Sequence, residues 1–189
     1  MNLQNWKWKI GEAIERVRSR YDYIGGKTGA PFLAVVYPTE MENAARKEWH
    51  DQTSALPLDF DVRPIDVLEI TQQILTDLGA QNVVAALRQP MPGSDPEIEL
   101  GSLWINAVAD AVRGCFSEPG SRKIVVVLER LSAFYPACGP RDVMQELWGS
   151  VQSSLDGPVV VLIPGHIEGP RTYSFLGKKS EFMYRGDLI

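Results

Sequence analysis

Cysteine and histidine are scarce in this chain, which has two of each among its 189 residues. Cys115 and Cys138 lack the spacing of a metal or redox motif, and His50 and His166 have no companions at ligand spacing. No Ser or Cys occupies a nucleophile-elbow sequence. We therefore predict no catalytic residues, no cofactor and no metal site, and thiols that stay reduced in a cytoplasmic protein.

Long apolar runs are also lacking, and so is a strong positive charge. No stretch reaches the roughly 20 apolar residues of a membrane-spanning helix, and the N-terminus lacks the apolar core of a secretory signal, so we expect no membrane contact. The formal net charge is −5, with a balance of +3 over residues 1–30 and −9 over residues 31–165. An acidic body of this kind argues against a broad nucleic-acid footprint.

What the chain has is an ordinary globular composition and a regular alternation of elements. With 44% apolar and 23% charged residues, residues 1–189 are predicted to form a single domain. Apolar periodicity predicts helices near residues 6–24, 39–50, 66–78, 83–87, 103–115 and 143–155, and strands at 32–37, 62–65, 124–128 and 159–163, with an edge strand near 182–188. This order predicts an α/β fold with a mainly parallel sheet flanked by helices.

Local signals refine several of these boundaries. Thr39 with Glu42, and Asp66 with Glu69, have the spacing of helix-capping pairs. Pro64 cannot donate to a strand ladder, so it should either weaken the strand at 62–65 or move it to an edge of the sheet. The strand at 159–163 is expected to stop at residues 164–165, a Pro-Gly pair.

Residues 25–28, Gly-Gly-Lys-Thr, invite comparison with a phosphate-binding loop. The full motif needs a further glycine at position 21, which is Tyr21 here, and it needs a strand before the loop and a helix after it. The order in this chain is the reverse. We interpret the segment as a helix-to-strand turn, so the fold is expected to be a degenerate P-loop or Rossmann-like sheet without a phosphate loop.

Two ionisable residues follow predicted strands and could lie at the functional edge of the sheet. Glu129 ends the strand at 124–128, where an ATPase holds its metal-binding acid, but we expect it to pair with Arg130 or to cap the next loop. His166 is expected in a loop beside Glu168, and a hydrolase built on His166 and Glu129 is the weakest of three functional hypotheses.

The tryptophans give a hint of association. Trp104 and Trp148 fall within apolar stripes of predicted helices and are expected in the core. Trp6 and Trp8 are two residues apart and cannot share one helix face, so one of them should be exposed or covered by another chain. The pattern leaves a homodimer through this helix open.

The C-terminal region interleaves basic and aromatic residues. Arg171 and Arg185 accompany the pair at 178–179, Lys178 and Lys179, and Tyr184 lies beside Arg185. Such a pattern can serve single-stranded nucleic acid, but Tyr and Arg are also the residues that anchor protein interfaces. We assign Arg171, Tyr184 and Arg185, together with the two N-terminal tryptophans, to partner binding.

The sequence resembles the BrxB family of bacterial BREX phage-defence systems over nearly its whole length. The likeness rests on a first strand that ends in Tyr37 and Pro38, the Ala-Phe-Tyr-Pro segment at 133–136, the strand with Pro-Gly at 159–165, Phe-Leu-Gly at 175–177 and Tyr-Arg at 184–185. The resemblance implies a small cytoplasmic component of a multi-protein machine, whose operon neighbours include a PglZ-like protein of alkaline-phosphatase fold, a large ATPase and an adenine methyltransferase. It carries no catalytic residues over.

The first functional hypothesis is therefore a non-enzymatic adaptor in a BREX-type phage-defence complex that binds a PglZ-like partner and other BREX components. The alternative is a nucleotide- or nucleic-acid-binding module that uses the carboxyl edge of the sheet, through His166, Arg171, Lys178 and Lys179.

Overall fold

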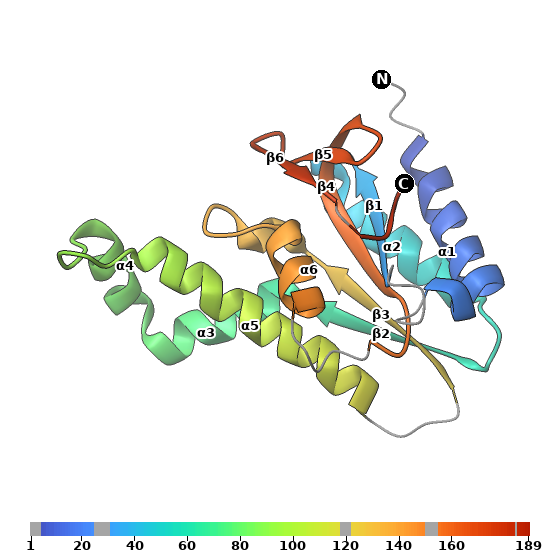
Figure 1. Ribbon diagram of the computed structural model, residues 1–189, viewed down its shortest axis with the longest axis horizontal. Coiled ribbons are helices and arrows are strands. Elements are labelled where there is room, and N and C mark those ends of the chain that lie inside the picture. Colours follow the sequence, from blue (N-terminus) through green and yellow to red (C-terminus); the bar gives the residue numbers. More distant parts are fainter. Residues whose placement is uncertain (1–4, 25–30, 118–121, 150–154, 184) are drawn as a thin grey trace.

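The computed structural model describes residues 5–24, 31–117, 122–149, 155–183 and 185–189, which form an α/β fold with a mostly parallel sheet between helices (Figure 1). The sheet order is β2-β3-β4-β1-β7, and each neighbouring pair is parallel. Its strands are β1 (Phe32–Tyr37), β2 (Phe60–Asp66), β3 (Lys123–Glu129), β4 (Val159–Gly169) and β7 (Asp187–Leu188). The predicted fold class is confirmed.

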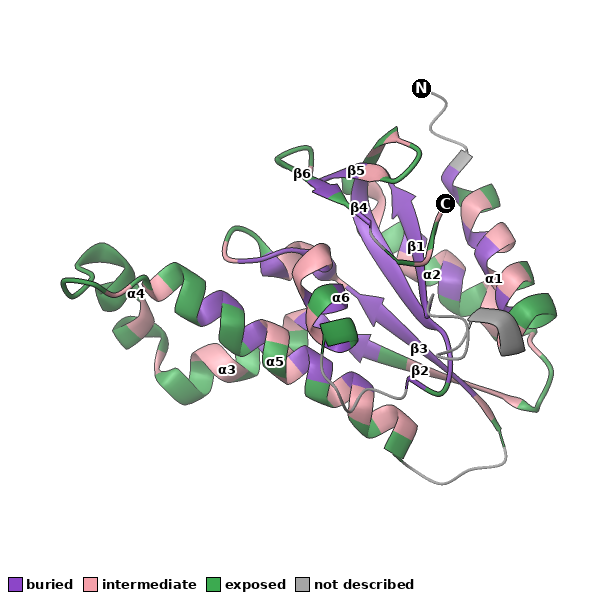
Figure 2. Ribbon diagram, viewed as in Figure 1, coloured by how far each residue is buried: buried purple, intermediate pink, exposed green. Residues whose placement is uncertain are grey.

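The helices cover both faces of the sheet, as the apolar strands predict. One face packs against α1 (Asn5–Ile24) and α2 (Glu42–Thr53), and the other against α3 (Val67–Leu78), α5 (Pro96–Ser117) and α6 (Pro140–Gly149). Side chains of β1 alternate between the two cores: Leu33 and Val35 face the first, and Ala34 and Val36 the second. Every residue of β1 is buried, and the central strands are correspondingly purple in Figure 2.

The strand at 159–163 does not stop at the Pro-Gly pair, and this expectation is wrong. Strand β4 continues to Gly169 and changes its pairing partner at the Pro-Gly pair. Residues 165–169 pair antiparallel with β5 (Thr172–Phe175), and β5 in turn pairs with β6 (Lys179–Phe182). A Cβ atom on Gly165 would lie 1.9 Å from the carbonyl oxygen of Ser174. Glycine is therefore needed where the two backbones approach, rather than to end the strand.

The capping signals had different outcomes. The Asp66 carboxylate accepts a hydrogen bond from the Glu69 backbone N–H at 3.3 Å and caps α3, as predicted. Thr39 does not cap α2, because Thr39–Met41 forms a 3₁₀ turn (η2) and α2 begins at Glu42. The Glu42 carboxylate instead accepts a hydrogen bond from the Ser132 backbone N–H at 3.2 Å, in the 3₁₀ turn η3 (Leu131–Phe134).

The remaining helix, α4 (Ala80–Arg88), forms a projection from the sheet together with parts of α3 and α5 (Figure 1). The chain leaves α3 at Gly79, forms α4, and returns through α5, so that α4 and the adjoining ends of α3 and α5 lie away from the strands (Figure 1). The predicted edge position of β2, with its Pro64, is confirmed. The glycine-rich segment at 25–28 lies outside the described residues.

Candidate functional site

The carboxyl ends of β2 and β3 carry a cluster of opposite charges. The Nε of Arg130 donates to Oδ1 of Asp66 at 2.7 Å, and Nη2 of Arg130 contacts both Oδ2 of Asp66 and Oε1 of Glu69. Nη1 of Arg46, on α2, lies 3.7 Å from Asp66 Oδ2. The hydrogen bond and charge of Asp66 raise the pKa of Arg130 further. This cluster connects the ends of β2 and β3 with α2 and α3, and its carboxylates form ion pairs with arginines.

Glu129 meets His50 rather than Arg130, so the expected ion pair is wrong. Nε2 of His50 lies 2.8 Å from Glu129 Oε1, although no hydrogen bond of good geometry reaches this oxygen from the described residues. The Glu129 side chain is only 3% exposed. Burial raises the pKa of Glu129, while the charge and contact of His50 act in the opposite direction.

His166 is not a loop residue, because it lies on the antiparallel part of β4 opposite Ser174. Its Nε2 is 3.7 Å from Glu168 Oε1, and the Oγ of Ser180 donates to the other oxygen of Glu168 at 2.6 Å. The structure thus joins His166 to Glu168 and Glu129 to His50. It shows no contact between Glu129 and His166, the pair that a hydrolase would need.

The hairpin of β5 and β6 is attached to α6 through a buried carboxylate that no sequence motif indicated. Glu181 is 1% exposed, and its Oε2 accepts hydrogen bonds from the Tyr173 hydroxyl at 2.7 Å and the Arg141 backbone N–H at 3.0 Å. Nζ of Lys179 lies 3.3 Å from Glu181 Oε1 and 3.1 Å from Oδ2 of Asp142. Lys179, one of the predicted nucleic-acid contacts, is thereby paired within the protein.

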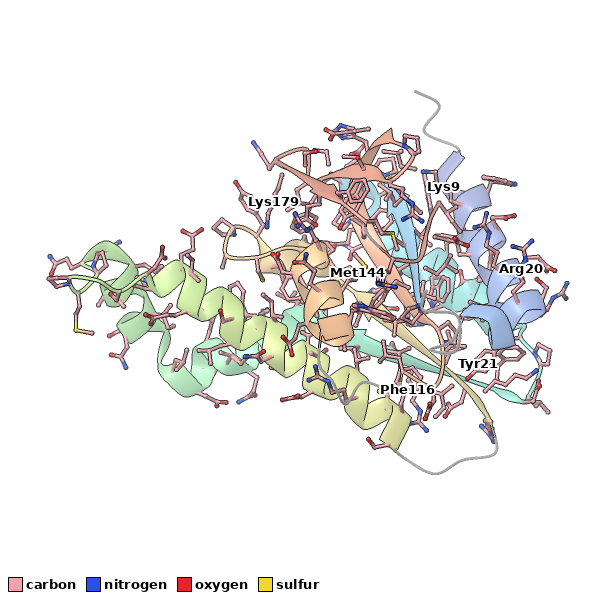
Figure 3. The ribbon with its side chains drawn as sticks, viewed as in Figure 1. Lys9, Arg20, Tyr21, Phe116, Met144 and Lys179 are labelled. Carbon is pink, nitrogen blue, oxygen red and sulfur yellow. The ribbon has the colours of Figure 1, made fainter. Side chains whose placement is uncertain are left out.

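A pocket of about 270 Å³ opens beside this hairpin, between α6 and the C-terminal segment. Cζ of Arg185 lies 4.2 Å from the centre of the Trp148 ring, in a cation–π contact. Both residues line the pocket, together with Phe32, Arg141, Met144 and Phe182. Figure 3 labels Met144 on α6. The pocket is therefore mainly apolar and aromatic, with two arginines.

Trp148 corrects a further expectation, since its residue is 38% exposed and lies at the mouth of this pocket rather than in the core. Trp104 is buried, as predicted. The apolar spacing along the helix predicted that Trp148 belongs to the core. This prediction failed because spacing along a helix does not show how far the surface that covers the helix extends. Arg185 supplies the missing contact, and it is 37 positions away in the sequence.

The other predicted partner-binding residues lie in two regions. Arg171 is exposed in the turn between β4 and β5, and its carbonyl oxygen accepts a hydrogen bond from the Met183 N–H at 2.8 Å, two residues before Arg185. Tyr184 lies outside the described residues. On α1, Trp6 is buried and Trp8 is 62% exposed, which confirms that the two occupy different faces of the helix.

Comparisons with known proteins assign no family. No family model matches the chain, and no curated protein matches it. One solved structure, described as Drosophila ORC bound to DNA, is similar over 86% of this chain and 43% of that chain, with 16% sequence identity and a TM-score of 0.34. The chain thus spans less than half the length of that protein, and a likeness at this level carries no argument about function.

The described residues show neither a membrane span nor a metal cluster. None of their helices is both long enough and apolar enough to cross a membrane. The same residues include no group of three or more His, Cys, Asp and Glu side chains placed to hold a metal ion.

Proposed function

We propose that this protein is a non-enzymatic adaptor of a BREX-type phage-defence complex, and that it binds a PglZ-like protein through the pocket beside Arg185. The proposal rests on one structural observation and on the sequence resemblance. The observation is a partly exposed aromatic and arginine surface, formed by Trp148, Arg185 and Phe182 around an open pocket. Exposed large aromatics and arginines are the residues that most often anchor protein interfaces.

The chemistry of the pocket suggests what enters it. Arg141 and Arg185 contribute two guanidinium groups to the lining, and none of the described residues that line the pocket carries a carboxylate. An aromatic or aliphatic anchor with a neighbouring acidic group would fill the apolar part and place its carboxylate beside Arg185. We expect the partner to present such an anchor on a rigid element.

The alternative, a nucleotide- or nucleic-acid-binding module, finds less support. The described carboxyl edge of β2 and β3 is rich in carboxylates, and those of Asp66 and Glu129 face arginine or histidine side chains of this chain. Lys179 is paired with Asp142 and Glu181. Phosphate groups would meet negative charge at this edge, so the adaptor is the proposal that we favour.

The test is co-expression of the tagged chain with the proteins of its genomic neighbourhood, followed by size-exclusion chromatography with light scattering. We expect a stoichiometric complex with a PglZ-like protein. Arg185→Glu and Trp148→Ala should each weaken it about 30-fold or more, as for a central interface residue. Arg18→Glu, at an exposed arginine of α1, is the matched control and should leave the complex intact.

Two outcomes would overturn the proposal. If the chain elutes without any of the co-expressed proteins, it is not an adaptor. A complex that forms but tolerates both pocket variants removes the pocket as its interface, and Trp8→Ala then tests the exposed tryptophan of α1 as the other predicted contact.

A further inference from the structure

Helix α4, at the end of the projection formed with α3 and α5, is not part of the hydrophobic core. Helix α4 contains Val83, Val84, three alanines and Leu87 within nine residues, yet no residue of it is buried. Val83 packs against the core as a partly buried residue, whereas Val84 and Leu87 are 45% and 43% exposed. An apolar helix stripe that stays in water is unfavourable, and it marks a surface that another chain can cover.

The exposed apolar residues continue on both sides of α4. Leu78 ends α3 and Met91 follows α4, and both are exposed, Met91 by 76%. We call Leu78, Val84, Leu87 and Met91 the arm surface. A shallow depression of about 550 Å³ runs along this helix and is lined by Ala80, Val84 and Ala85, with Arg88 at its C-terminal end as the charged residue of the lining. Figure 2 shows exposed residues over most of this end of the molecule.

The charge around the arm surface selects its occupant. Residues 67–117 contain six Asp and Glu against two Arg, a balance of −4 within a chain whose net charge is −5. Asp95, Glu97 and Glu99 are exposed near the start of α5, and in the described part of the chain no ion pair involves them. A partner that covers the apolar stripe would bring its own charges close to these carboxylates.

We propose that the arm surface docks a basic amphipathic helix of a second protein, with apolar residues on α4 and Lys or Arg beside the carboxylates of α5. Nucleic acid and anionic membranes would be repelled by the negative charge. Two copies of the arm in a symmetric pair would place like charges together. A basic helix satisfies both features, because apolar anchors at helical spacing fit an extended stripe and opposite charges steer the encounter. The inference does not depend on the pocket beside Arg185.

A direct binding assay tests this chemistry. The probes are two labelled 18-residue helical peptides with the same leucine face, one carrying lysines and the other glutamates on the polar face. The full-length protein should bind the lysine peptide, more tightly at low salt than at high salt, and should not bind the glutamate peptide. Equal binding of both peptides would overturn the proposal.

Variants locate the binding. Val84→Ser combined with Leu87→Ser should weaken the lysine peptide about tenfold or more, since it removes apolar contact without changing charge. Leu58→Ser, at a residue that is 93% exposed outside the arm, is the matched control and should bind like the wild type. Glu97→Lys should weaken binding at low salt, and Glu40→Lys should not. If the arm variants bind the lysine peptide as tightly as the wild type does, the peptide binds outside the arm surface and the proposal is wrong.

A photo-crosslinking residue at Met91, in the complex purified from its native host, then identifies the occupant. The crosslinked segment should belong to a second protein and carry an excess of Lys and Arg over Asp and Glu. An acidic segment, or a second copy of this chain, would overturn the proposal. Because the pocket variants leave the arm intact, loss of the adaptor function and loss of arm docking are separate results.

Discussion

Carboxylates at the ends of the strands and carboxylates on the helical arm have opposite environments. Glu181 and Glu129 are almost fully buried and lie against Lys179 and His50 of the same chain, whereas Glu97 and Glu99 on α5 are exposed. A buried carboxylate without hydrogen bonds or a counter-charge is strongly destabilising, so the first set has to be satisfied within the fold. The second set remains solvated, contributes little to folding, and is available to a partner.

Among the carboxylates, the largest loss of stability should appear on removing Glu181. Glu181→Ala takes away the acceptor of the Tyr173 hydroxyl and of the Arg141 backbone N–H, and it removes one of the two carboxylates that contact Lys179. We expect the free energy of unfolding to fall by about 2–3 kcal/mol, as for lost hydrogen bonds to a buried charge. Urea denaturation followed by circular dichroism measures this change.

The same substitution on the arm sharpens the contrast. Glu99→Ala removes an exposed carboxylate from the first turn of α5 and should cost at most about 0.5 kcal/mol, through the helix dipole alone. If the two variants lose the same stability, the distinction between structural and partner-directed carboxylates is wrong.

An intermediate effect, and one that depends on pH, is expected at Glu129. Burial raises its folded-state pKa above the reference of 4.5, so between 4.5 and that raised pKa the folded state holds more protons than the unfolded state. Stability should therefore fall as the pH rises through this window. Glu129→Gln has no proton to lose, so its stability relative to the wild type should increase as the pH rises from 4.5.

His50 provides a second test of this pH dependence. Its charge lowers the pKa of Glu129, so His50→Gln should allow that pKa to rise further and should steepen the pH dependence. Adding Glu129→Gln to His50→Gln should abolish the extra slope. Parallel pH profiles for wild type and Glu129→Gln would show that Glu129 does not titrate differently on folding.

The limits of prediction from sequence follow from the same contrast between local and distant contacts. The buried strand β1 and the cap at Asp66 were predictable, because they depend on apolar runs and on spacings of three residues. The path of β4 past Gly165 was not, since it depends on β5, which follows it in the chain and turns back on it. An antiparallel partner of this kind leaves no signal in the strand itself.

The candidate site shows the same division. Arg185 was singled out by its basic and aromatic surroundings, and this part of the prediction can be made locally. Its contact with Trp148 and the pairing of Glu129 with His50 join residues 37 and 79 positions apart, and no spacing rule reaches across such distances. The arm surface was missed for another reason: periodicity identifies an apolar face but does not show whether anything covers it.

Apolar residues of the arm surface should also contribute little to stability. Val84→Ser combined with Leu87→Ser changes side chains that are nearly half exposed, so the free energy of unfolding should fall by only about 1 kcal/mol, through partial loss of apolar contact and lower helix propensity. Val112→Ser, the same change at a fully buried position of α5, should cost about 3 kcal/mol through lost apolar burial and a buried hydroxyl. Thermal and urea unfolding compare the two. A large loss from the arm variant would mean that α4 already packs against its own chain, and its apolar stripe would then be structural rather than a surface for a partner.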